Sequence, residues 1–127
     1  MLCVRQGAEG PEVLLVQTLD TGRWIIPKGW PMKRRAMHVA AAREAWEEAG
    51  AKGRVSPEEI GRLADSKRLK NGIVVPSEIV VFRMDDTTLA DRYPEAGRRN
   101  RRILPAAKAA DQADMPDLAA LIRRLFP

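Results

Sequence analysis

The segment from Gly29 to Ala51, GWPMKRRAMHVAAAREAWEEAGA, constrains this chain more than any other part of its sequence. Its many alanines predict a helix over about Ala36–Ala49, and Gly50 is well placed to end it in the left-handed conformation. Positions three and four apart share a helix face, so three glutamates point the same way: Glu44, Glu47 and Glu48. Like charges at this spacing repel, and a helix C-terminus already carries partial negative charge. A divalent cation is the obvious compensating partner.

The same segment resembles the box of the Nudix hydrolase family. That box is a glycine, five residues, a glutamate, seven residues, and then Arg-Glu-aliphatic-x-Glu-Glu-x-Gly-aliphatic. Six positions match it: Gly29, Arg43, Glu44, Glu47, Glu48 and Gly50. With residue frequencies near ~7 %, six matches at one spacing arise by chance roughly once in 10⁷ starting points. Three positions depart: Arg35 stands where the family has glutamate, and Ala45 and Ala51 are smaller than the usual aliphatic residues.

The resemblance implies a role for each matching residue. Glu47 and Glu48 would bind Mg²⁺ or Mn²⁺ directly, with a backbone carbonyl near Gly29 as a further ligand. Glu44 would bind a metal or help the attacking water. Arg43 would hold a glutamate of the cluster through charge-assisted hydrogen bonds. Hard cations of this kind bind carboxylate oxygens and bridge to phosphate oxygens, which suits the hydrolysis of a phosphoanhydride bond.

Residues outside the box add candidates to the site. Some members of the family supply a general base or metal ligand from another carboxylate, for which Glu78 is the first candidate; the alternative is an exposed strand glutamate. Weaker candidates are Asp85, Asp86 and Glu95. Lys28 precedes the loop glycine and either reaches a substrate phosphate or is an ordinary solvated lysine.

The net charge of +5 is concentrated in three clusters: Lys33–Arg35, Lys67–Lys70 and Arg98–Arg102. They are either solvated surface or a basic rim around an anionic pocket, in which Arg99 and Arg101 would grip a polyphosphate. Charge alone leaves nucleic-acid binding open. No zinc-finger, RRM or KH signature accompanies it, and only 5 % of residues are aromatic, which offers few stacking platforms. The expected partner is therefore a phosphorylated small molecule, in particular a nucleotide.

Length and composition are those of one globular domain, residues 1–127, with 45 % hydrophobic and 31 % charged residues. No apolar run approaches membrane-spanning length, and no signal peptide is visible, so we expect a cytoplasmic protein without a membrane partner. Cys3 is alone, which rules out a disulfide framework. A homodimer is an alternative that the sequence leaves open.

Hydrophobic periodicity and turn residues predict the remaining elements. The expected strands are Leu2–Gln6, Glu12–Gln17, Arg23–Ile26, Glu59–Lys67, Ile73–Met84 and Arg101–Leu104, and the further helices are Pro105–Asp111 and Pro116–Phe126. Asp85–Asn100 reads as a long exposed loop. Within the first helix the predicted buried stripe is Val39, Ala42, Trp46 and Ala49, with the carboxylates facing away from it. The order suits an α+β domain similar to the Nudix fold, an α/β/α sandwich with a mixed β-sheet packed between helices.

The expected function is that of a metal-dependent hydrolase. Its substrate would be a nucleoside diphosphate linked to another moiety, such as a dinucleoside polyphosphate, or a diphosphoinositol polyphosphate. One alternative is a nucleotide-binding sensor that has lost turnover, which is prompted by Arg35, Ala45 and Ala51. A third reading, prompted by the basic charge, is an RNA-end-processing or RNA-binding protein.

Overall fold

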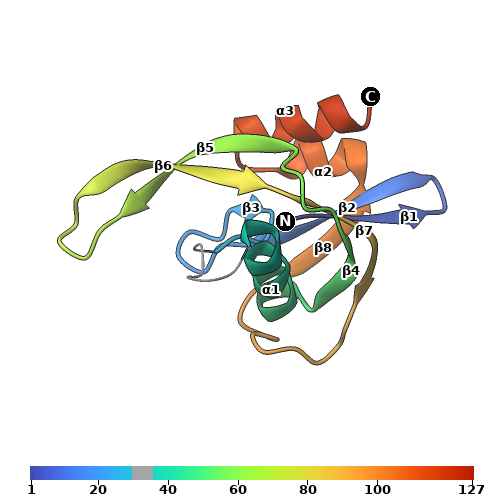
Figure 1. Ribbon diagram of the computed structural model, residues 1–127, viewed down its shortest axis with the longest axis horizontal. Coiled ribbons are helices and arrows are strands. Elements are labelled where there is room, and N and C mark those ends of the chain that lie inside the picture. Colours follow the sequence, from blue (N-terminus) through green and yellow to red (C-terminus); the bar gives the residue numbers. More distant parts are fainter. Residues whose placement is uncertain (30–35) are drawn as a thin grey trace.

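The computed structural model describes residues 1–29 and 36–127, so Arg35 and the basic cluster Lys33–Arg35 lie outside the described residues. The strands are β1 (Leu2–Gly7), β2 (Gly10–Gln17), β3 (Trp24–Ile25), β4 (Ala51–Val55), β5 (Gly61–Arg68), β6 (Val74–Val81), β7 (Arg83–Leu89) and β8 (Arg101–Pro105). The helices are α1 (Met37–Ala49), α2 (Ala106–Gln112) and α3 (Pro116–Leu125). Figure 1 shows their arrangement.

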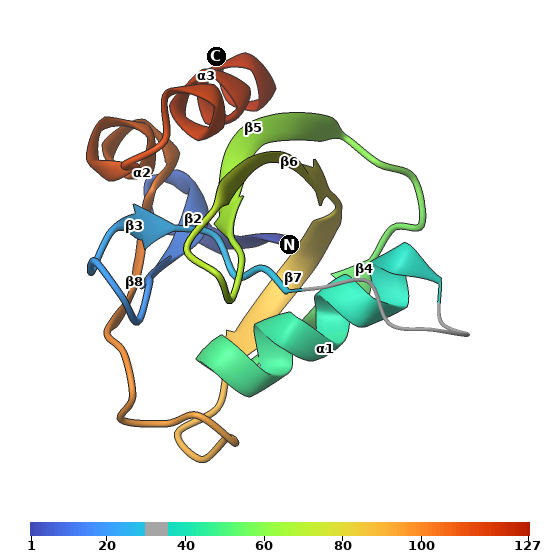
Figure 2. The ribbon, with the colours of Figure 1, turned by 90° about the vertical axis from the view of Figure 1, so that its left-hand side faces the viewer.

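The main sheet is mixed and has six strands in the order β3-β2-β1-β7-β4, with β8 added beside β2. β1 and β7 are parallel, and the other pairs are antiparallel. Along β2 the side chains alternate between two buried clusters. Val13 and Leu15 face a cluster that includes α2 and α3, whereas Leu14 and Val16 face one that includes α1. The sheet therefore lies between helices, as the sequence predicted (Figures 1 and 2).

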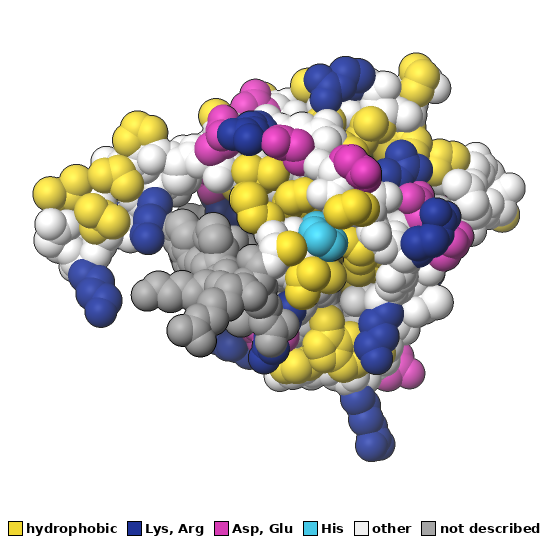
Figure 3. Space-filling view, viewed as in Figure 1, with side chains coloured by type: hydrophobic (Ala, Val, Ile, Leu, Met, Phe, Trp, Pro, Cys, Tyr) yellow, Lys and Arg dark blue, Asp and Glu magenta, His cyan; other side chains and the backbone are white. Residues whose placement is uncertain are grey.

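The strands β5 and β6 form a separate antiparallel ribbon, with registers from Gly61 opposite Val81 to Arg68 opposite Val74. Its base joins the core through Leu63 and Val81. Its far end extends beyond the body of the molecule (Figure 1). Hydrophobic side chains gather on this end in Figure 3, and two exposed ones there are Ile73 and Val74.

Three predictions about the elements were wrong. The expected strand Ile73–Met84 is divided between β6 and β7, and β7 continues to Leu89 through the first part of the expected loop. This polar segment is held as a strand because it pairs with β4, while β1 pairs with Arg83 and Met84 at the start of β7. β4 itself was not predicted, because its Lys-Gly-Arg centre lacks an apolar pattern and its three middle residues are exposed.

The predicted buried face of α1 was wrong in part, because Ala49 is buried but Val39 is not. Val39 is 41 % exposed, whereas the buried residues of the helix are Ala40, Ala45, Glu48 and Ala49. Alanine side chains are small and let the helix approach the sheet closely. The face of α1 that packs against the sheet is therefore the one with the smallest side chains. In consequence Glu48 enters the interior beside the sheet instead of facing away from it.

No helix among the described residues is long and apolar enough to cross a membrane.

Candidate active site at the C-terminal end of helix α1

The end of α1 is fixed by its packing and its terminating glycine. Ala45 and Ala49 are fully buried against the sheet, and Ala51, at the start of β4, is 1 % exposed. Gly50 has φ 65°, and its N–H donates to the carbonyls of Ala45 and Trp46. Only a residue without a Cβ adopts this conformation cheaply. The last turn of the helix, with its glutamates, is therefore held rigidly at one place beside the sheet.

Glu44 lies against the backbone of Gly29. A Cβ at Gly29 would fall onto Cδ of Glu44, so a side chain at this position would displace the Glu44 carboxylate. No hydrogen bond or ion pair from a described residue reaches the Glu44 carboxylate. Partial burial raises its pKa, and the negative charges of Glu47 and Glu95 raise it further. Glu44 is thus a carboxylate that other carboxylates surround and that nothing in the described structure neutralises directly.

Glu48 is the most buried of the three glutamates, with 9 % of its side chain exposed. Its Oε2 accepts the backbone N–H of Lys28 at 3.0 Å, and its Oε1 accepts Nη1 of Arg99 at 2.7 Å. Burial raises the pKa of Glu48 to about 7, although Arg99 lowers it. Glu48 therefore joins the helix to the loop before Gly29 and to the segment before β8.

Arg99 and Arg101 both act within the protein, although they were expected to grip phosphate. Arg99 Nη2 donates to Glu95 Oε1 at 2.5 Å, so its guanidinium lies between Glu48 and Glu95. Arg101 Nη1 donates to the carbonyls of Ala49 and Ala90, and its guanidinium lies 4.8 Å from the ring centre of Tyr93. Both side chains are engaged in joining the end of α1 to the segment 90–100.

Glu47 is held from the outside of the helix. Arg43 Nε donates to Glu47 Oε1 at 2.9 Å, one helical turn away, which is the contact that the sequence resemblance implied. The Glu47 carbonyl accepts the backbone N–H of Glu95 at 3.0 Å. Glu95, which the sequence offered as a weak candidate, is therefore fastened next to the three glutamates of the helix.

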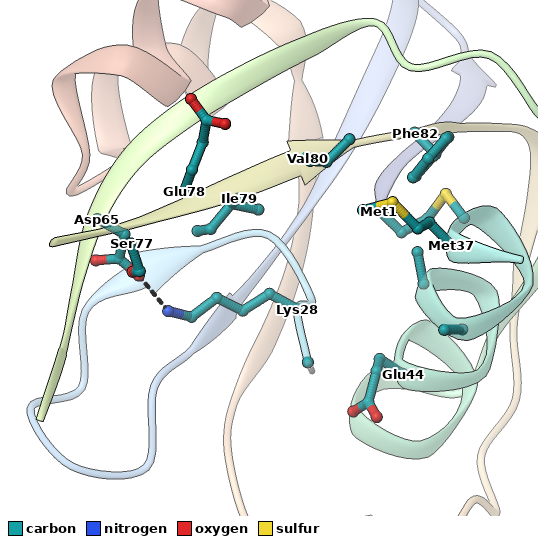
Figure 4. A pocket seen from close by; sticks show the side chains of 13 residues that line it. Met1, Lys28, Met37, Glu44, Asp65, Ser77, Glu78, Ile79, Val80 and Phe82 are labelled. Atoms are coloured by element: carbon teal, nitrogen blue, oxygen red, sulfur yellow. Dashed lines mark hydrogen bonds and ion pairs between the residues drawn. The ribbon is translucent and has the colours of Figure 1, made fainter. Parts of the chain in front are cut away.

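A cavity of about 320 Å³ opens beside Glu44 and Gly29 (Figure 4). Its apolar side comes from the helix, the chain start and β6, and includes Met1, Met37, Ala40, Ala41, Val80 and Phe82. At the other end Lys28 extends to Asp65, with Nζ 2.5 Å from Oδ2. Asp65 was not predicted, because a single aspartate inside a strand carries no sequence signal of its own.

The candidate carboxylates outside the box are not brought to Glu44, except for Glu95. Glu78 borders the cavity, but its carboxylate points away from Glu44 and pairs with Arg62 at 2.9 Å (Figure 4). Alternation along β6 explains this, because Ser77 and Ile79 take the face toward Lys28. Asp85 pairs with Arg83, and Asp86 pairs with Arg54 at the exposed surface.

The residues present fit a hard cation in their chemistry. Glu44 is unpaired within the described structure and stands in a space that exists only because residue 29 has no side chain. Carboxylate oxygens are the ligands that Mg²⁺ prefers. Across residues 1–29 and 36–127, however, no three acidic, His or Cys side chains are grouped as a ready metal site. Glu47 and Glu48 are turned toward Arg43 and Arg99 instead.

Comparison with known proteins gives the same family as the sequence motif. The family model of the NUDIX domain matches residues 1–125. The fold is similar to that of an Ap4A hydrolase from C. elegans, with TM-score 0.64 and 21 % identity over 98 % of this chain and 90 % of that chain. It also resembles the Nudix hydrolase RenU from M. smegmatis, with TM-score 0.60 and 20 % identity, over 98 % and 79 %. A MutT protein from Bacillus halodurans matches with TM-score 0.62 and 16 % identity, over 98 % and 78 %.

Proposed function

This chain belongs to the Nudix family and is a pyrophosphohydrolase of that family, and we propose that it uses Mg²⁺ or Mn²⁺ to hydrolyse a nucleoside diphosphate linked to another moiety. The observation that carries the proposal is the contact of Glu44 with Gly29 at the edge of the cavity. It supports the proposal because this carboxylate, unpaired among the described residues, would lie beside the phosphates of a substrate bound in the cavity. The buried Glu48 and its neighbour Glu47 stand next to it on the same helix end.

The residues of the site divide the work as follows. The metal, when bound, neutralises phosphate charge and lowers the pKa of a bound water. Glu44, Glu47 and Glu48 would hold it through their oxygens, and Glu44, which has the most open position beside the cavity, would also orient the attacking water. Arg43 keeps Glu47 in place on the helix surface. Gly29 leaves the space in which the Glu44 carboxylate stands.

The apolar part of the cavity favours one substrate class over another. Among the described lining residues, Asp65 is paired with Lys28 and Glu78 with Arg62, which leaves a largely apolar surface on the other side. A diphosphoinositol polyphosphate has no apolar or aromatic part to lie against that surface. An uncharged nucleoside can instead lie against the apolar side formed by Met37, Val80 and Phe82. This supports a nucleotide-linked substrate such as a dinucleoside polyphosphate, in line with the likeness to a protein named Ap4A hydrolase.

Two of the three sequence features that prompted the alternative, a sensor without turnover, have a structural explanation. Ala45 and Ala51, which are smaller than the usual aliphatics of the box, are fully buried in the cluster between α1 and the sheet. Both alanines pack in this cluster, and α1 still lies against the sheet. Smaller residues there are thus a packing solution and give no reason to expect lost activity.

The test is a panel of dinucleoside polyphosphates, nucleotide sugars, nucleoside triphosphates and diphosphoinositol polyphosphates, each with and without Mg²⁺ or Mn²⁺. We expect metal-dependent release of nucleoside phosphates from the linked nucleotides, and a loss of kcat of at least about 100-fold in Glu48→Gln. Glu9→Gln, in the exposed turn between β1 and β2, is the matched control and should keep full activity. Full activity of Glu48→Gln, or turnover that is unaffected by EDTA, would contradict the proposal.

A further inference from the structure

Arg99 occupies the middle of the acidic site. Its side chain is 9 % exposed, and its two terminal nitrogens are bound to carboxylates that come from different parts of the chain. Nη1 contacts Glu48 of the helix at 2.7 Å, and Nη2 contacts Glu95 of the segment before β8 at 2.5 Å. Its Nε is buried and has no hydrogen-bond partner among residues 1–29 and 36–127. This is a cation enclosed by acidic groups and still incompletely bonded.

We propose that the Arg99 guanidinium is a built-in counter-ion at the place of a divalent cation, and that a metal must displace it from Glu48 and Glu95 in order to bind. The inference rests on the metal dependence proposed above and adds Glu95 to the residues that face the metal. Arg99 would keep Glu48 and Glu95 paired until a metal binds, and it would turn away from these carboxylates when they hold the metal.

The competition follows from the position of the guanidinium. Its two terminal nitrogens contact Oε1 of Glu48 and Oε1 of Glu95, so it fills the space in which a metal held by both carboxylates would lie. A guanidinium and a divalent cation repel each other strongly at that distance in a site shielded from water. The unpaired Nε means that Arg99 gives up fewer bonds on leaving than a fully satisfied buried arginine would.

The surroundings allow Arg99 to leave without loosening the segment that carries it. The Glu95 N–H remains bound to the Glu47 carbonyl, and Arg101 remains bound to the carbonyls of Ala49 and Ala90. Glu95 is therefore kept beside the helix by the backbone and by a second arginine. Displacement of Arg99 consequently exposes a prepared set of carboxylates to the metal.

The experiment compares Mn²⁺ affinity in the wild type, in Arg99→Met and in Arg101→Met, measured by calorimetry and by the loss of the free Mn²⁺ electron paramagnetic resonance signal. Methionine keeps much of the length of the arginine stem but carries no charge. Arg101→Met is the matched control, because Arg101 joins the same two segments without touching a carboxylate. Thermal unfolding in EDTA and in saturating Mn²⁺ is recorded for all three proteins.

We expect Arg99→Met to bind Mn²⁺ at least about tenfold more tightly than the wild type, which corresponds to about 1.4 kcal/mol. Its melting temperature should fall in EDTA and rise more than that of the wild type on adding Mn²⁺. Arg101→Met should lose stability in both conditions and keep the wild-type Mn²⁺ affinity. If Arg99→Met is unfolded in EDTA but folds in Mn²⁺, the metal has replaced the guanidinium and the proposal stands.

Unchanged or weaker Mn²⁺ binding by Arg99→Met would overturn the inference, as would a variant that stays unfolded in saturating Mn²⁺. These results are distinct from failure of the proposed function, in which the wild type itself would bind no Mn²⁺ and show no metal-dependent turnover. Glu95→Gln provides a second check: it should weaken Mn²⁺ binding by about tenfold if Glu95 faces the metal. Wild-type affinity in that variant would also count against the inference.

Discussion

Gly29 has no room for a side chain, because the Glu44 carboxylate stands where a Cβ would be. We predict that Gly29→Ala pushes Glu44 out of its position and lowers kcat by at least about 30-fold, since displacements near 1 Å at a reacting centre carry costs of this order. Gly97→Ala is the contrasting variant. Its added Cβ meets no atom, but its φ of 83° makes alanine unfavourable, so it should lose about 1 kcal/mol of stability and keep its activity. Activity of Gly29→Ala equal to the wild type would show that the contact has no role.

Glu48 should make the metal-free protein less stable as pH rises. Its pKa in the folded protein is about 7, against 4.5 as the ordinary value, so the folded state binds this proton more tightly than the unfolded state. Stability from this group is present below pH 4.5 and is lost as pH rises through 7, by up to about 3 kcal/mol. Urea unfolding in EDTA at pH 5 and pH 8 measures the change.

Glu48→Gln isolates that contribution, because glutamine does not titrate. The difference in unfolding free energy between pH 5 and pH 8 should be smaller in the variant than in the wild type by about 2–3 kcal/mol. Mg²⁺ should restore stability to the wild type at pH 8, since a metal binds the ionised carboxylate. An equal pH dependence in the two proteins would mean that Glu48 ionises normally in the fold.

At the scale of elements, Gly50 sets where α1 ends and so where its last glutamates stand. A Cβ there would lie 2.6 Å from Cδ1 of Tyr93, at a φ of 65°. Gly50→Ala should therefore destabilise the protein by about 2–3 kcal/mol, through backbone strain and a steric clash together. Thermal unfolding tests this, with Gly72→Ala as control, because its φ is 85° but its Cβ would be in open space. Equal losses in the two variants would rule out the Tyr93 contact as a cause.

The sequence predicted the helix of the box closely, because alanine propensity and a terminating glycine are local signals. It did not predict which face of that helix is buried. Val39 and Trp46 looked like core residues, yet the packed face is made of alanines together with Glu48. The buried Glu48 is paired with Arg99, which lies 51 positions further along the chain. An ion pair between residues so far apart leaves no periodic signal in a single sequence. For the same reason the strands β4 and β7, whose stability comes from neighbouring strands, could not be read from their own residues.

In the candidate site, too, the residues of the local motif were predicted better than the residues that long-range contacts bring in. The motif contains Gly29, Glu44, Glu47 and Glu48. In the structure Glu44 contacts Gly29 and Glu48 accepts the N–H of Lys28, whereas Glu47 is turned toward Arg43. Residues from outside the motif had to be guessed from charge alone. Of these, Glu78 faces away from Glu44, and Arg99 and Arg101 are internal. Asp65 and Glu95 gained their place through tertiary contacts with Lys28 and Arg99.

At the scale of the whole molecule, the cavity lies between α1 and the ribbon of β5 and β6. The helix α1 and the loop residues Lys28 and Gly29 line one side, while the ribbon of β5 and β6 supplies Ser77 and Ile79 on the opposite side. A two-stranded ribbon is only marginally stable by itself. Its position over the cavity therefore depends on its base in the core and on contacts such as that of Lys28 with Asp65.

We predict that Asp65→Asn weakens substrate binding more than it weakens chemistry. The side chain of Asp65 is 8 % exposed. Burial raises the pKa of Asp65, but the hydrogen bond from Lys28 brings this pKa below its usual value, which identifies a favourable ion pair. Without that pair the ribbon is held less firmly over the cavity, so KM should rise about three- to tenfold while kcat changes less than about twofold. Stability should fall by about 1–2 kcal/mol.

Asp111→Asn is the matched control, because it breaks an exposed ion pair with Arg123 on the helices α2 and α3, outside the described lining of the cavity. Its KM should equal that of the wild type, and its stability should change by less than about 0.5 kcal/mol. A wild-type KM in Asp65→Asn would mean that the ribbon keeps its place without Lys28. A fall in kcat as large as the rise in KM would instead assign Lys28 and Asp65 to the reacting end of the substrate, because groups that only close the cavity act on binding and leave the chemical step unchanged.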